Sequence, residues 1–288
     1  MSSSMPQSSA PAVAGPLPAP TAPPSPALAF IDGQAVNAPT LATAVEMAMA
    51  RLRTGRGFTL FTLNLDHLVK RRADPTFRYA YARADIVTAD GQPVVTLARK
   101  QGAKLERATG ADLVVPLCAA AEAERVPVYL FGATEESLQR ASNQLRRWFP
   151  RLDVRGAEAP PMGFDPDGET ALAAGEKIAA SGARLCFVAL GAPKQELFAA
   201  RMAALAKAGG QDRVGYVCIG AALDFISGHQ QRAPRIFQQL GLEWVYRLCA
   251  HPGRLGMRYA RCAVLYARLR LGGLHGPLTG RLDRPASA

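Results

Sequence analysis

The chain has 288 residues, 49% of them hydrophobic, which excludes an extended, disordered protein and allows a sizeable core. No apolar run approaches the roughly 20 residues that a membrane-spanning helix needs, and no basic export signal precedes the first charge, Asp32. The five cysteines have no paired spacing, which favours reduced thiols over disulfides or a zinc site. We therefore expect a cytoplasmic, globular protein.

The formal net charge of +11 is concentrated at one end of the chain. Residues 232–288 contain ten arginines, no lysine, one glutamate and one aspartate, a net charge of +8, so only +3 remains for residues 1–231. The basic character therefore belongs to a C-terminal segment rather than to the whole fold.

The two ends of the chain are predicted to lack fixed structure. Residues 1–28 contain eight prolines and no charge, which is typical of a disordered, partly extended tail. Residues 272–288, rich in Gly, Pro and Arg, are expected to be disordered as well.

Short apolar strands alternate with helical stretches between the tails. The predicted strands are 28–31, 58–63, 85–91, 126–132, 152–155, 185–191 and 214–219. Helices are predicted over 40–53, from 64, over 75–83, 109–124, 134–149 and 169–181, and from 193. This alternation predicts an α/β fold, with a mostly parallel sheet covered by helices on both faces.

Several strands end in glycine or polar motifs that right-handed crossovers would bring to one edge of the sheet. The motifs are Thr62-Leu63-Asn64, Asp90-Gly91, Gly132-Ala133-Thr134, Gly191 to Glu196, and Gly220 to Asp224. Ligands of open α/β sheets bind at this edge, where free N–H groups at helix starts favour phosphate. The pattern therefore suits a nucleotide-linked substrate.

Asp90 is the candidate general base, because a carboxylate at a strand end can take a proton from a bound hydroxyl. The alternative is structural, since Asp-Gly is a common turn pair and Asp often caps a helix. Asp112 competes for the role but falls inside a predicted helix. Asp224 is a third carboxylate, expected to orient a loop or to contact the nucleotide-linked substrate.

The sequence lacks the motifs that mark several other kinds of ligand, catalytic and metal site. No strand is followed by G-x-G-x-x-G, and there is no Walker A loop, G-x-S-x-G elbow or H-E-x-x-H pair. The four histidines lie far apart, so a histidine metal site is not expected. Asp165-Pro166-Asp167 fits a metal-binding D-x-D pattern, but its place just before a helix favours capping.

Taken together, the motifs resemble the WecG/TagA/CpsF glycosyltransferases (glycosyltransferase family 26) over roughly residues 30–270. The matching pieces are Thr62-Leu63-Asn64 with Asp66-His67, Ala89-Asp90-Gly91, Glu106 to Asp112, Gly191 to Glu196, Gly220 to Gly228, Arg232-Ala233-Pro234, Gly241 to Leu248, His251 to Arg254, and Arg258-Tyr259. Two positions depart from the family pattern: Leu63 stands where proline is frequent, and Ala222-Leu223 replaces a glycine/phenylalanine pair.

The resemblance implies a Rossmann-like fold of the GT-E type and a metal-independent, inverting transfer without a cofactor. The donor would be a UDP-sugar and the acceptor a polyprenyl-diphosphate-linked sugar at the inner face of the bacterial membrane. Asp90 matches the proposed base, and Thr62, Asn64 and Gln195 match polar residues of the same pocket. The expected substrate-binding residues are Gly91, Gly132, Gly191, Lys194, Gly220, Asp224, Arg232, Arg235, Arg247, Arg254 and Arg258.

We expect a catalytic domain over 29–231 and a basic helical appendage over 232–271. From Leu255 the apolar positions recur at helical spacing beside a stripe of arginines, which is typical of a helix on an anionic membrane surface. The alternative is a helix packed on the core with a solvated basic face. Two other functions stay open, a nucleic-acid-binding module and a non-catalytic UDP-sugar scaffold, and so does the oligomeric state.

Overall fold

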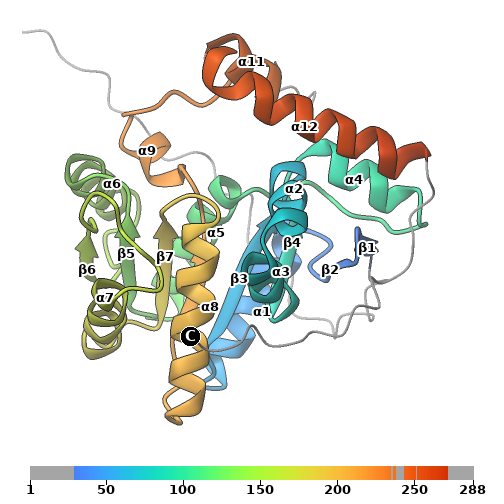
Figure 1. Cartoon of the computed structure of the whole chain (residues 1–288). Helices are drawn as coiled ribbons and strands as arrows, with labels where there is room; N and C mark the ends of the chain where they lie inside the picture. Colours follow the sequence, from blue (N-terminus) through green and yellow to red (C-terminus); the bar gives the residue numbers. More distant parts are fainter. Residues whose placement is uncertain (1–28, 235, 238–242, 251, 272–288) are drawn as a thin grey trace, which may run out of the picture.

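The computed structural model describes residues 29–271, apart from 235, 238–242 and 251. A six-stranded parallel sheet forms its centre, with the strand order β4-β3-β8-β7-β5-β6 (Figure 1). The strands are β3 (Phe58–Leu63), β4 (Ile86–Ala89), β5 (Val128–Gly132), β6 (Val154–Glu158), β7 (Leu185–Ala189) and β8 (Gly215–Cys218). An antiparallel hairpin of β1 (Ala29–Ile31) and β2 (Gln34–Val36) lies beside it.

Helices cover both faces of the sheet, as the sequence predicts. One face packs against α2 (Leu65–Ala73), α3 (Pro75–Ala82), α4 (Gln92–Arg99), α7 (Glu169–Ala180) and α8 (Lys194–Ala208). The other packs against α1 (Leu41–Arg53), α5 (Gly110–Ala123), α6 (Glu135–Trp148) and α9 (Ala222–Ile226). The Rossmann-like fold class is therefore confirmed.

The unbroken apolar run of β3 follows from its central position. Phe61 and Leu63 belong to the core on one face, whereas Phe58 and Leu60 belong to the core on the other. Successive side chains of a strand point to opposite faces, so a strand covered on both sides is apolar at every position.

The strand order creates a crevice between β3 and β8. The chain leaves β3 into α2 on one face of the sheet and leaves β8 into α9 on the other. Neighbouring strands whose following helices diverge in this way leave a gap at their carboxyl ends, which is where open α/β sheets bind ligands.

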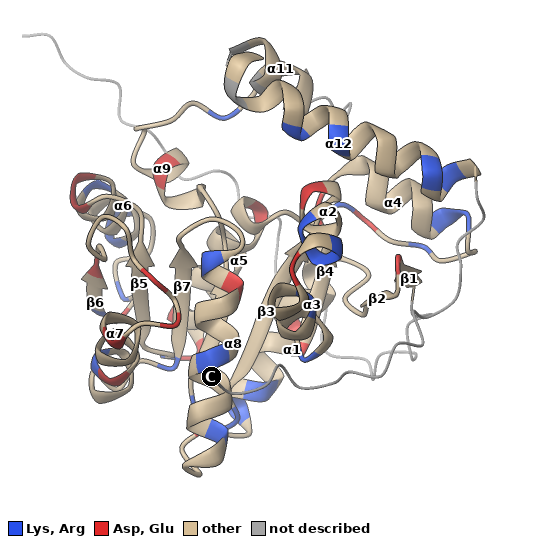
Figure 2. Ribbon diagram, viewed as in Figure 1, with Lys and Arg blue, Asp and Glu red and all other residues tan. Residues whose placement is uncertain are grey.

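Two C-terminal helices, α11 (Glu243–Ala250) and α12 (Pro252–Leu271), lie across this edge, and α12 packs against α2 and α4 (Figure 1). Leu255, Cys262 and Leu269 of the predicted apolar stripe are buried, so that stripe packs on the protein itself. Figure 2 shows basic residues along α12. Over the described parts of the chain, no helix is long and apolar enough to cross a membrane.

Candidate active site

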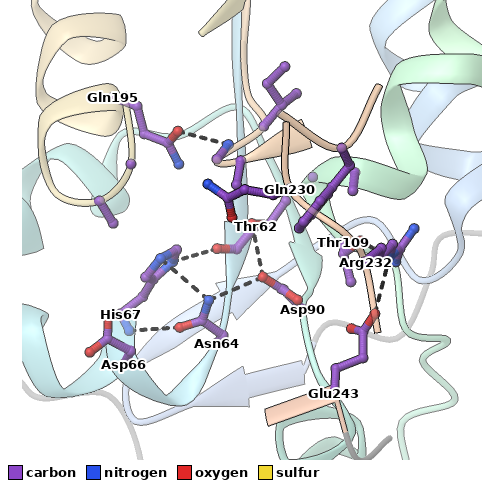
Figure 3. A pocket seen from close by; sticks show the side chains of 18 of the residues that line it. Thr62, Asn64, Asp66, His67, Asp90, Thr109, Gln195, Gln230, Arg232 and Glu243 are labelled. Atoms are coloured by element: carbon purple, nitrogen blue, oxygen red, sulfur yellow. Dashed lines mark hydrogen bonds and ion pairs between the residues drawn. The ribbon is translucent and has the colours of Figure 1, made fainter. Parts of the chain in front are cut away.

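A polar cavity of about 390 Å³ lies at the carboxyl ends of β3, β4, β7 and β8 (Figure 3). The loops after these strands form its floor, and α11 and α12 contribute to its wall. We call it the polar cavity; its lining includes Thr62, Asn64, Asp66, His67, Lys70, Asp90, Thr109, Gly191, Gln195, Gly220, Phe225, Gln230, Arg232, Glu243, Tyr246 and Arg258.

Asp90 is held in a fixed position at the edge of the sheet. Its backbone N–H donates to the carbonyl of Leu63 at 2.8 Å, which continues the β3–β4 ladder by one residue. Its carboxylate Oδ2 accepts hydrogen bonds from Asn64 Nδ2 at 3.1 Å and from Thr62 Oγ1 at 3.5 Å. Within the described residues no donor reaches Oδ1, so this oxygen is available to a ligand.

The surroundings of Asp90 favour its protonated form more than water does. Burial raises the pKa of this carboxyl above its usual value, and the nearby charges of Asp112 and Glu243 add to the effect. The hydrogen bond from Asn64 and the charge of Arg107 oppose it. A carboxylate with a raised pKa is a stronger proton acceptor, as a general base must be.

Asn64 is oriented by the helix that it starts. It is the N-cap of α2, where its Oδ1 accepts the backbone N–H of His67 at 3.0 Å. The side-chain oxygen is thereby committed to the cap, which leaves Nδ2 to donate to Asp90.

The buried imidazole of His67 lies beside the side chain of Asn64. Burial lowers the pKa of His67 to about 4, so its imidazole is neutral near pH 7. Its Nδ1 lies 2.7 Å from both the carbonyl oxygen of Thr62 and the hydroxyl of Tyr81. A carbonyl can only accept, so a hydrogen bond to Thr62 requires the proton on Nδ1, and Nε2, 3.4 Å from Asn64 Nδ2, is then an acceptor. The sequence placed His67 in a family motif but did not reveal this role, which depends on α2 folding back onto β3.

Gln195 joins the ends of two strands. This buried side chain accepts the backbone N–H of Gly220, after β8, through Oε1 at 3.0 Å. Its Nε2 donates to Glu196 Oε1 at 2.8 Å. The amide of Gln195 is thereby fixed at the cavity wall (Figure 3).

Glu196 is fully buried, and its burial raises the pKa of the carboxyl from 4.5 to about 7. Between these pH values the folded protein binds a proton that the unfolded chain has released, so stability falls as the pH rises through this window. We expect the uncharged isostere Glu196→Gln to escape this loss. Urea titrations should show that the unfolding free energy of the variant, relative to that of the wild type, rises by up to about 3 kcal/mol between pH 4.5 and pH 8.

The matched control is Glu135→Gln, which alters an exposed glutamate at the start of α6. This control should show no comparable gain over the wild type. A constant difference for Glu196→Gln as well would show that Glu196 is ionised throughout, contrary to this prediction.

Arg232 closes one side of the polar cavity through a group of ion pairs. Its Nη2 lies 2.8 Å from Asp112 Oδ1, and its Nε lies 3.1 Å from Glu243 Oε1. Glu243 also pairs with Arg107, at 3.1 Å. Asp112 forms a capping box with Thr109 at the start of α5, so the competing carboxylate has a structural role here.

The structure brings most of the predicted site residues together. Those that line the polar cavity are Thr62, Asn64, Asp90, Gly191, Gln195, Gly220, Arg232 and Arg258. Gly91 lines a neighbouring cavity. Arg235 lies outside the described residues, as do the side chains of Arg247 and Arg254.

Three predicted residues line neither cavity, and their roles as substrate contacts stay predictions. Lys194 is exposed at the start of α8. Asp224 accepts a hydrogen bond from Gln230 Nε2 at 3.0 Å and so orients a residue of the lining. Gly132 packs against the backbone of Ala189 in β7.

Asp165, of the D-x-D sequence, accepts the backbone N–H of Asp167 at 3.0 Å and so stabilises the turn before α7. The described residues contain no group of three or more His, Cys, Asp or Glu side chains arranged to hold a metal ion.

A second cavity of about 340 Å³ adjoins the polar one and shares Asn64, Asp66, Asp90, Glu243 and Arg258 with it. We call it the aromatic cavity, since Trp244, Tyr259 and Tyr266 line it. Asp90 lies where the two cavities meet.

A Rossmann-like sheet with a crevice at its strand ends and a carboxylate between two cavities is the arrangement of an α/β protein that binds ligands at this edge. A family model described as "Glycosyl transferase WecG/TagA/CpsF family" matches residues 30–274. The chain belongs to this family and is therefore a glycosyltransferase, which binds a sugar donor and an acceptor.

Proposed function

We propose that the protein is a metal-independent, inverting glycosyltransferase. It would move a hexose or N-acetylhexosamine from a UDP-sugar to a polyprenyl-diphosphate-linked sugar, in bacterial exopolysaccharide or cell-wall polymer synthesis. The observation that carries this proposal is Asp90, a partly buried carboxylate with a raised pKa at the junction of two cavities, whose Oδ1 accepts no hydrogen bond from the described part of the chain.

In the proposed reaction, an acceptor hydroxyl attacks the anomeric carbon of the donor from the face opposite the diphosphate. Asp90 Oδ1 takes the hydroxyl proton as the new C–O bond forms. The bond between the anomeric carbon and the diphosphate oxygen breaks, and its electron pair leaves with UDP. Hydrogen bonds from Asn64 and Thr62 fix the position of Asp90 Oδ2 during this step.

The departing UDP gains negative charge, which cations of the polar cavity stabilise in place of a metal. Arg232, Lys70 and Arg258 all line this cavity. Asp66 fixes two of them, since it lies 2.6 Å from Lys70 Nζ and 3.0 Å from Arg258 Nε.

The outer face of α12 supports attachment to the inner face of the membrane. Met257, Val264 and Leu271 are 67%, 54% and 85% exposed, and their seven-residue spacing aligns them along the helix. Arg261 and Arg268 are exposed on the same side. An apolar row flanked by arginines suits an anionic bilayer surface, which would bring the active site to a lipid-linked acceptor.

The test is UDP release from a panel of UDP-sugars, with a polyprenyl-diphosphate sugar as the acceptor and with EDTA in excess. We expect acceptor-dependent release with one donor and full activity in EDTA. Strict dependence on Mg²⁺ or Mn²⁺ would contradict the metal-independent mechanism. Saturable UDP-sugar binding without any transfer would favour a non-catalytic scaffold instead.

A further inference from the structure

The two cavities on either side of Asp90 differ in chemistry, although they share five lining residues. The polar cavity contains the glycine loops after β7 and β8, together with Lys70 and Arg232. The aromatic cavity contains none of these; its own residues are Leu65, Gly91, Gln92, Pro93, Arg107, Trp244, Tyr259, Cys262, Ala263 and Tyr266. One carboxylate thus faces two sites suited to different ligands.

The aromatic cavity suits a phosphate less well than the polar cavity does, because it has one cation fewer for the same three carboxylates. Two arginines, Arg107 and Arg258, line it together with three carboxylates, Asp66, Asp90 and Glu243. Both arginines already lie within 3.1 Å of a carboxylate oxygen, from Glu243 and Asp66 respectively. The carboxylates of this cavity outnumber its cations. They therefore repel a negatively charged diphosphate, but they do not repel a neutral ligand that carries hydroxyl groups.

The aromatic wall fits the face of a sugar ring. Trp244 is 43% exposed, and its ring centroid lies 5.7 Å from that of Tyr259. The apolar C–H face of a pyranose packs well on such rings, because aromatic faces carry partial negative charge and bury a large apolar area. The polar side of the cavity, with Asp90 and Asn64, meets the hydroxyl groups at the ring edge.

We propose that the aromatic cavity binds the sugar ring of the acceptor on Trp244 and Tyr259, with its attacking hydroxyl directed to Asp90, while the donor occupies the polar cavity. This assignment rests on the proposed function, because it requires transfer between two sugars. It places the acceptor and the donor in adjoining cavities that both reach Asp90, so the attacking oxygen can approach the anomeric carbon from the side opposite the departing diphosphate, as inversion requires.

Steady-state kinetics test the role of Trp244 once a donor and an acceptor have been identified. We expect Trp244→Ala to raise the acceptor KM about ten-fold while the UDP-sugar KM stays constant. Trp244→Phe, which keeps an aromatic face, should restore most of the loss. The control is Tyr79→Ala, which removes a ring from α3 outside both cavities. An unchanged acceptor KM, or an equal rise in the donor KM, would overturn the assignment.

Fluorescence tests the site without requiring turnover. The chain has two tryptophans, and Trp148→Phe leaves Trp244 as the only one. The probe is N-acetylglucosamine linked through a diphosphate to a short prenyl chain, and it should change Trp244 emission saturably. The same prenyl diphosphate without the sugar, and UDP alone, should have little effect. An equal response to either control ligand would overturn the assignment of this cavity to a sugar.

The two proposals fail in different ways. If the full-length protein releases no UDP from any donor, the proposed function is wrong, yet a saturable response of Trp244 to the sugar probe still supports the sugar site. If UDP is released and Trp244→Ala leaves the acceptor KM unchanged, the transferase assignment stands and the sugar site is wrong.

Discussion

Asp90→Asn is expected to lower the rate of sugar transfer by about 10³-fold or more, because an amide cannot accept the proton of the attacking hydroxyl. The substitution keeps the size of the side chain and an oxygen that can accept from Asn64, so the fold and the polar cavity should be preserved. UDP affinity, measured by calorimetry, should therefore change only slightly while transfer is lost. That split between binding and turnover distinguishes a base from a residue that merely shapes the site.

The control for Asp90→Asn is Asp153→Asn, which makes the same chemical change at an exposed ion pair with Arg155. It should transfer sugar at the wild-type rate. Near-normal turnover by Asp90→Asn would remove Asp90 from the mechanism, and a loss of UDP binding in step with activity would assign it to donor binding instead.

Gly132→Ala is expected to destabilise the protein by about 3 kcal/mol or more. Gly132 ends β5 with a φ of +115°, and an added Cβ would lie 2.5 Å from the carbonyl carbon and oxygen of Ala189 in β7. These atoms belong to a central strand and cannot move aside without breaking the sheet. Urea denaturation at neutral pH measures the effect.

Gly102→Ala separates steric overlap from backbone strain. Gly102 also has a positive φ, +79°, which is closer to the left-handed region open to residues with a side chain, and no atom lies within 4 Å of its added Cβ. It should lose only about 1 kcal/mol, the cost of a left-handed conformation in a residue with a side chain. Equal losses in the two variants would show that backbone conformation alone requires glycine at position 132.

The central strands could be predicted from sequence because burial on both faces makes each one an unbroken apolar run. The helices predicted from residues 40 and 134 are also found, as α1 and α6, because the hydroxyls of Thr40 and Thr134 accept N–H groups of the first turn. Helix α4 was missed because Gly91-Gln92-Pro93 suggests a turn, although proline fits the first helical turn. β2 was missed because three residues carry too little alternation to be recognised.

The central residues of the site could be predicted because they stand at or directly after the ends of strands in the sequence. Thr62, Asn64 and Asp90 follow parallel strands, and parallel strands bring such residues to one edge whatever the details of packing. The surrounding residues depend on long-range contacts that no local pattern encodes. Glu196 is buried only because α8 packs on the sheet, and Trp244 lines a cavity with Asp90 only because α11 lies across the edge of the sheet.

Arg232 already holds two anions, Asp112 and Glu243, before any substrate arrives. A diphosphate that reaches this guanidinium must replace at least one of them, so its binding there is an exchange of partners and not the filling of a vacant positive site. The free energy gained on binding the diphosphate is therefore smaller than it would be if the three cations of the polar cavity were unpaired. UDP affinity should accordingly depend less steeply on ionic strength than the number of basic residues around the ligand suggests.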